Sequence, residues 1–236
     1  LGSRPVFAMG NPGTALLDYA ERIRYVHEQF GVRDFVVLME RGDVRQSLCG
    51  SGNSNGPCLD PETLAPRVET LAPPGTAKRI FRHSALAQYL FGQLKFSPAK
   101  LWRQALRPSH GAGLVPQGTG RNGLSTPSEE VSPFVDAVTN AFLERVKPHV
   151  TGRLVIVIDS DRGALFKGLL KPDPSRARFI ELARAAGVIV IDTEPLFQTH
   201  FARSVLKLDV GPYDGHFNAL GVYLITQAAA KALSQP

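Results

Sequence analysis

The sequence predicts an α/β protein in which helices cover both faces of a parallel sheet. Four short apolar runs alternate with stretches of helical periodicity along the 236 residues. The runs are apolar at every position, which is typical of strands that are buried on both sides in a parallel sheet. A chain of this length supports one large domain with a substantial core, so we expect a single domain over 1–236.

The first elements lie between residues 5 and 39. Residues 5–9 (PVFAM) have the composition of a strand, and 35–39 (FVVLM) that of a buried strand. Between them, 14–30 carries apolar residues at helical spacing and ends before Gly31, a typical helix stop. The order strand, helix, strand is that of a βαβ unit.

The second half repeats the alternation. A helix is expected around 135–146, followed by the buried strand 154–158 (LVIVI). A helix over 175–186, closed by Gly187, precedes the strand 188–191, and a last helix covers 219–233.

Residues 59–130 break the pattern and are expected to form a helical and loop insertion in the domain. Within them, 84–95 has helical spacing, and 107–127 is rich in Gly, Ser and Pro, which indicates a loop. Gly118–Gly123 matches the dinucleotide pattern G-x-G-x-x-G, but neither a strand nor a helix flanks it. An unrelated nucleotide-binding α/β domain is therefore the least favoured interpretation, after the two given at the end of this subsection.

The net charge is +6, and cations gather with aromatic residues in 79–107. The simplest interpretation is an amphipathic helix with a solvated basic face; an acidic polysaccharide or an anionic membrane surface is the functional alternative. No nucleic-acid recognition motif accompanies the charge, so no nucleic-acid partner is expected. No run of 18 apolar residues is present, so no transmembrane helix is expected.

Cys49 and Cys58 are the two cysteines, and they bracket a polar loop. This arrangement favours a disulfide and an oxidising compartment over a pair of reduced thiols. No further Cys or His follows at ligand spacing, and the remaining histidines are dispersed, so no metal site is expected.

The candidate catalytic pair is Asp214 and His216, in a Gly/Pro-rich loop before the last helix. A carboxylate beside an imidazole is the arrangement of a general base and its orienting group. The alternative is a helix start capped by Asp214 or Asn218. Carboxylates in 159–161 and 192–194 end two strands, where turn and cap roles are favoured over a ligand crevice.

These residues resemble the last motif of the SGNH (GDSL-like) hydrolase superfamily. Asp214, His216, Asn218 and Gly221 match the form D-x-H-x-N-x-x-G found in cell-envelope branches of that superfamily. The resemblance implies a flavodoxin-like sheet, with His216 and Asp214 as two members of a catalytic triad. It also implies a substrate-binding role for Asn218.

Two further stretches are similar to blocks of the same superfamily. Residues 8–13 resemble the second block, which implies an oxyanion role for Gly10 and a substrate role for Asn11. Residues 35–43 resemble the third block, where Gly42 or Asp43 stands in place of the usual asparagine. Gly42 would then donate its amide to the oxyanion, and Asp43 would contact substrate.

The first block of the superfamily, a strand followed by Gly-Asp-Ser, is absent from these residues. In the flavodoxin-like order that strand is central, and 5–9 and 35–39 would flank its empty place. The chain begins with Leu, and we expect a fragment of a longer protein whose serine lies upstream.

The resemblance implies a serine-dependent acyl-ester hydrolase or O-acyltransferase that acts on acylated, for example O-acetylated, carbohydrate and needs no cofactor. The expected location is periplasmic or extracellular. The alternative is a non-catalytic domain of the same fold that binds or scaffolds a cell-envelope glycan. The two differ in whether a serine nucleophile exists.

Overall fold

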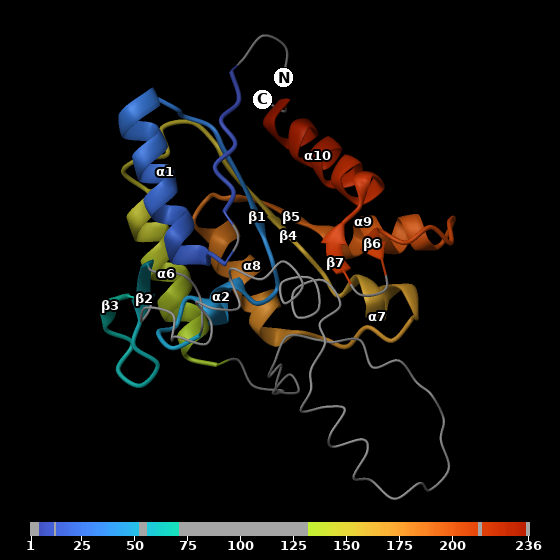
Figure 1. The fold of residues 1–236 in the computed structure, drawn as a ribbon, viewed down its shortest axis with the longest axis horizontal. Coiled ribbons are helices and arrows are strands. Elements are labelled where there is room, and N and C mark those ends of the chain that lie inside the picture. The colour runs from blue at the N-terminus through green and yellow to red at the C-terminus, as the bar shows by residue number, and fades with distance from the viewer. Residues whose placement is uncertain (1–4, 12, 52–55, 71–131, 212–213, 235–236) are drawn as a thin grey trace, which may run out of the picture. The chain divides into compact units, whose positions relative to one another are not determined.

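Figure 1 shows the fold in a computed structural model. The structure describes residues 5–11, 13–51, 56–70, 132–211 and 214–234, which belong to one compact unit. Its helices are α1 (Leu16–Phe30), α2 (Asp43–Gln46), α6 (Phe134–Val146), α7 (Arg162–Phe166), α8 (Pro174–Ala185), α9 (Thr193–Phe201) and α10 (Ala219–Ser234). Its strands are β1 (Phe35–Met39), β2 (Gly56–Leu59), β3 (Pro66–Glu69), β4 (Leu154–Ile158), β5 (Ile189–Asp192), β6 (Asp209–Gly211) and β7 (Asp214–Phe217).

The centre of the fold is a three-stranded parallel sheet in the order β1-β4-β5. β1 pairs with β4 from Phe35 opposite Leu154, and β4 pairs with β5 from Val155 opposite Ile189. This confirms the predicted α/β character and three of the four predicted strands.

Helices cover both faces of β4, whose five residues are all buried. Leu154, Ile156 and Ile158 point into one core, together with α1, α6 and α8. Val155 and Val157 point into a second core, which α7, α9 and α10 complete. The uninterrupted apolar run 154–158 is therefore explained by burial on both sides.

The predicted strand over residues 5–9 is not formed. The segment lies along α1, where the Phe7 ring stacks on Phe30 with centroids 4.9 Å apart and Arg22 Nη1 donates to the Met9 carbonyl at 2.8 Å. A strand needs a neighbour that pairs its amides and carbonyls. Among the described residues β1 pairs with β4 alone, so the segment does not pair with β1 and lies against α1 instead.

β1 consequently lies at an edge of the sheet formed by the described residues. Phe35, Val37 and Met39 point into the first core, whereas Val36 and Leu38 on the opposite face are 47% and 44% exposed. A strand of a doubly covered sheet normally buries both sets of side chains, so this corner of the sheet is uncovered among the described residues.

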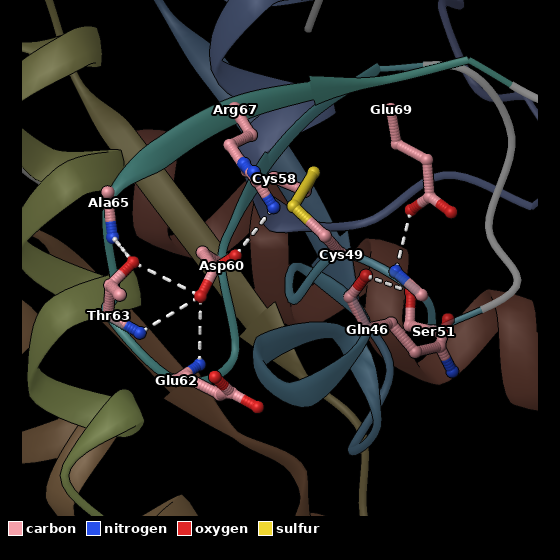
Figure 2. Close-up of a disulfide and its surroundings, with 11 residues drawn as sticks. Gln46, Cys49, Ser51, Cys58, Asp60, Glu62, Thr63, Ala65, Arg67 and Glu69 are labelled. Atoms are coloured by element: carbon pink, nitrogen blue, oxygen red, sulfur yellow. Dashed lines mark hydrogen bonds and ion pairs between the residues drawn. A yellow bond between two sulfur atoms is a disulfide. The ribbon is translucent and has the colours of Figure 1, made fainter.

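A second, small sheet is the antiparallel hairpin β2–β3, shown in Figure 2. A disulfide joins Cys49 to Cys58 at the start of this hairpin, with the two Cα atoms 5.1 Å apart. Asp60 organises the turn, because its carboxylate accepts from the amides of Glu62 and Thr63 and from Arg67. The hairpin runs across the start of the predicted insertion at residue 59 and was not itself predicted.

In the part of the chain that the structure describes, every helix is too short or too polar to cross a membrane. The predictions for 79–107, 84–95, 107–127 and Gly118–Gly123 lie outside the described residues.

Candidate active site

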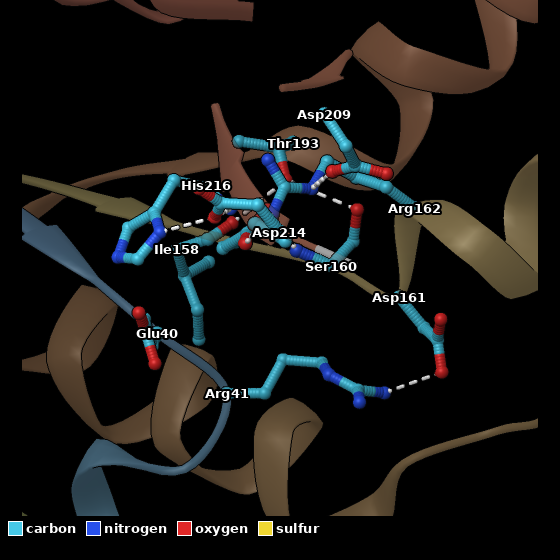
Figure 3. Close-up of polar contacts among 12 residues, drawn as sticks. Glu40, Arg41, Ile158, Ser160, Asp161, Arg162, Thr193, Asp209, Asp214 and His216 are labelled. Atoms are coloured by element: carbon cyan, nitrogen blue, oxygen red, sulfur yellow. Dashed lines mark hydrogen bonds and ion pairs between the residues drawn. The ribbon is translucent and has the colours of Figure 1, made fainter. Parts of the chain in front are cut away.

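The candidate site lies at the edge of the sheet where the parallel strands end (Figure 3). Glu40 and Arg41 follow β1, and Ser160 and Asp161 follow β4, with Arg41 Nη1 bound to Asp161 Oδ2 at 2.9 Å. The antiparallel hairpin β6–β7 is positioned over the same edge and carries Asp214, Gly215 and His216. The carboxyl ends of parallel strands are where ligands bind in such folds.

Asp214 and His216 form the hydrogen-bonded pair that the sequence predicted. The Nδ1 atom of His216 is 2.5 Å from Asp214 Oδ1, and the backbone amide of His216 donates to the same oxygen at 3.0 Å. The segment that was expected to be a loop is instead strand β7 of a hairpin. Side chains two residues apart on a strand point to the same face, so the Asp214 carboxylate and the His216 ring lie together. Both side chains face solvent, at 51% and 84% exposure, so Nε2 of His216 is open to a reactant.

Asn218 makes three hydrogen bonds within the fold, and its predicted substrate role stays a prediction. Its amide donates to the carbonyls of Lys207 and Asp209 at 2.8 and 3.1 Å, and its Oδ1 accepts from the Gly221 amide at 2.9 Å. Both donors and the acceptor are therefore used to join β6 to the first turn of α10. The helix-cap alternative describes Asn218 correctly, since a cap side chain binds an amide of the first turn.

Asp43 is buried, with only 2% of the residue exposed, and its predicted contact with substrate stays a prediction. Its Oδ2 accepts from the Tyr19 hydroxyl at 2.9 Å and from the Glu40 amide at 2.8 Å. Burial raises the pKa of Asp43 to about 7 and outweighs these hydrogen bonds, which lower it. The carboxylate thus holds the turn after β1 against α1 rather than opposing an oxyanion.

Asp159 is a second buried carboxyl at this edge, at the end of β4. Burial raises its pKa to about 6, partly offset by the nearby Arg162 guanidinium and by the Ser160 amide, which donates to Oδ1 at 2.8 Å. The other strand-end carboxylates cap helices as expected: Asp161 accepts from the Ala164 amide and Asp192 from the Glu194 amide.

The three remaining candidates come from two turns. Gly10 and Asn11 are exposed before α1, and the Asn11 carbonyl accepts from Thr14 Oγ1 at 2.7 Å. Gly42 is half-buried before α2, where an added Cβ would stand 2.6 Å from Gln46 Nε2. Their oxyanion and substrate roles stay predictions.

Ser160 is the serine that the strand ends bring to this edge, and it is not placed to react. It is 3% exposed, and its hydroxyl lies 3.3 Å from Thr193 Oγ1, which donates to the Ile158 carbonyl. A nucleophile must reach substrate, so Ser160 belongs to the packing of β4 and β5.

Among the described residues, no group of three or more His, Cys, Asp or Glu side chains is placed to hold a metal ion. Several strand-end carboxylates pair with arginines: Arg176, which is buried, binds Asp192 and Glu194 at 2.6 and 3.1 Å. Sequence reasoning missed Arg162 and Arg176, whose local signal was only their position at or near the start of a helix, α7 and α8 respectively.

Comparison with known proteins gave no family: no family model, no curated protein and no solved structure matches this chain.

Proposed function

We propose that this chain carries the base of a serine-dependent acyl-ester hydrolase or O-acyltransferase of the SGNH type, acting on acylated carbohydrate. The observation that carries the proposal is the bond between Asp214 and His216 at the strand-end edge of a parallel sheet. A carboxylate on Nδ1 fixes the tautomer in which Nε2 accepts a proton, and it stabilises the imidazolium that then forms.

In the proposed reaction a serine hydroxyl attacks the ester carbonyl while His216 Nε2 takes its proton. The tetrahedral intermediate then collapses, and the imidazolium gives that proton to the departing alkoxide. The acyl group remains on the serine as an acyl-enzyme. Water completes hydrolysis and a carbohydrate hydroxyl completes transfer, with His216 again as the base. A correctly placed base of this kind contributes about 10²–10⁴-fold to the rate.

The serine is proposed to lie outside residues 1–236, on a strand that joins the open edge of β1. Among the described residues β1 has a partner on one side only, and its own residues Val36 and Leu38 are exposed on one face. A strand parallel to β1 would end at the edge where His216 lies, and a serine there would approach Nε2. The disulfide Cys49–Cys58 is consistent with a periplasmic or extracellular location.

The test is release of acetate from an O-acetylated polysaccharide by the full-length gene product, compared with transfer to an unacetylated acceptor glycan. We expect His216→Ala to lower the rate by about 10²–10⁴-fold. His149→Ala is the matched control, because this histidine lies between α6 and the start of β4, where its ring centre is 5.8 Å from that of His27. Equal rates for the wild type and His216→Ala would refute the proposal.

The second candidate is a non-catalytic domain that binds or scaffolds a cell-envelope glycan. It is favoured by one observation: the serine at the site, Ser160, is buried and bonded to Thr193. It predicts glycan binding with no acetate release from any form of the protein, whereas the enzyme predicts release that depends on His216.

A further inference from the structure

We propose that Arg162 is a positioning residue that clamps the hairpin β6–β7 to the end of β4 and thereby fixes Asp214 and His216. The inference deepens the proposed function, and its catalytic meaning rests on that function. The clamp itself is a property of the fold and is tested separately from any reaction.

Arg162 is the first residue of α7 and lies four positions after Ile158, the last residue of β4. Asp161 precedes it as the helix cap, accepting from the Ala164 amide at 2.9 Å, so the start of the helix is fixed relative to β4. The Arg162 side chain is only 10% exposed, although it begins at a surface turn. Its guanidinium is therefore enclosed between the strand end and the hairpin (Figure 3).

One side of the guanidinium is anchored to β4 and the other to the hairpin. Nη2 lies 3.4 Å from Asp159 Oδ2 at the strand end, and Nε lies 3.2 Å from Asp209 Oδ1 on β6. The guanidinium carbon also lies 3.7 Å from the centre of the Phe217 ring on β7, a cation–π distance. One side chain thus contacts β4 and both strands of the hairpin.

The decisive contact is with the peptide between the two candidate catalytic residues. Arg162 Nη2 donates to the Gly215 carbonyl at 2.5 Å, so it holds the peptide group that joins Gly215 to His216. Both Asp214 and His216 are largely exposed, and the Gly215 carbonyl between them is bound by the buried Arg162 side chain. The orientation of the pair relative to the sheet therefore depends on where this backbone is held.

These contacts need the shape of a guanidinium as well as its charge. The planar fork of Arg makes several directed hydrogen bonds and stacks on an aromatic ring, whereas the ammonium of Lys is a compact point charge. A lysine at 162 would keep a cation near Asp159 and Asp209 but would not also stack on Phe217 and reach the Gly215 carbonyl. We therefore expect Lys to fail as a replacement.

The experiment measures backbone ¹⁵N order parameters of Gly215, His216 and Phe217 in the wild type, Arg162→Gln and Arg162→Lys. We expect about 0.85 in the wild type, as in rigid backbone, and a fall below about 0.6 in both variants. Arg176→Gln is the matched control, because Arg176 is equally buried and ion-paired but binds Asp192 and Glu194 instead of the hairpin. It should leave the three order parameters unchanged.

Asp209→Asn is a milder variant in case Arg162→Gln does not fold, since it removes one ion pair on the hairpin side. We expect it to lower the order parameters by a smaller amount. Unchanged values in Arg162→Lys and Asp209→Asn, or the same loss in Arg176→Gln, would overturn the clamp. Because no ester is involved, absence of hydrolysis would refute the proposed function and leave this result standing.

Discussion

Replacing Asp43 by Asn should stabilise the protein at neutral and alkaline pH. The carboxyl is buried, and its pKa is raised from the ordinary 3.8 to about 7 mainly by loss of hydration. Asn offers an oxygen at the place of Oδ2, so the hydrogen bonds from the Tyr19 hydroxyl and the Glu40 amide can persist. The substitution thus removes a buried charge while keeping its hydrogen-bond acceptor.

The sign and size of the effect follow from proton linkage. Because the folded-state pKa exceeds the unfolded one, the contribution of Asp43 to stability is largest below pH 4. This contribution falls as the pH rises to about 7, and above that pH the effect of Asp43 on stability no longer changes. At about 1.4 kcal/mol for each pKa unit, the loss is about 4 kcal/mol at full ionisation. Asp43→Asn should recover about 2–4 kcal/mol at pH 8 and little at pH 4.

The assay is urea unfolding at pH 4, 6 and 8, with the free energy of unfolding extrapolated to water. Asp60→Asn is a control of opposite sign, since backbone amides of Thr63 and Glu62 lower the pKa of Asp60. Its carboxylate stabilises the fold above the unfolded pKa, so this variant should lose stability at pH 8. The reasoning is refuted if Asp43→Asn is no more stable than the wild type at pH 8.

Two further perturbations, the reduction of a disulfide and one substitution, test the packing of the fold. Opening the Cys49–Cys58 disulfide, which closes a sequence separation of 9, should cost about 2–3 kcal/mol. Urea midpoints with and without dithiothreitol measure this loss, and equal midpoints would contradict it. Gly221→Ala would place a Cβ 2.6 Å from the Phe217 ring and should cost about 1–3 kcal/mol in thermal unfolding. Val222→Ala, at a site that is 45% exposed, should change stability by less than about 0.5 kcal/mol; equal losses in both variants would refute the close-packing argument.

The fold was predictable where local pattern and tertiary burial agree. The apolar run in β4 was recognised because burial on both faces leaves no polar position within the strand. The runs in β1 and β5 were recognised by the same pattern, although β1 buries one set of side chains only and β5 is partly exposed. Residues 5–9 have the same local pattern and form no strand, because strand formation depends on a partner far away in the sequence. The hairpins β2–β3 and β6–β7 contain proline or glycine and few apolar residues, so their sequences carried no strand signal.

The contacts of the candidate site were likewise predictable only where they join residues close together in the sequence. The spacing of Asp214 and His216 predicted their contact, because two residues of a tight chain segment cannot lie far apart. The inward turn of Asp43 could not be predicted, since Tyr19, its partner, lies 24 positions away. The contact of Arg162 with Gly215 could not be predicted either, because the two residues are 53 positions apart. Side-chain direction at such places is set by tertiary packing.

The central claim is that His216 activates a serine, and covalent labelling tests it most directly. The full-length protein would be treated with a fluorophosphonate, which phosphonylates activated serines, and the labelled residue located by mass spectrometry. We predict labelling of one serine in the wild type and labelling at least about 100-fold slower in His216→Ala. An unlabelled wild type, or equal labelling rates in the two proteins, would contradict the account.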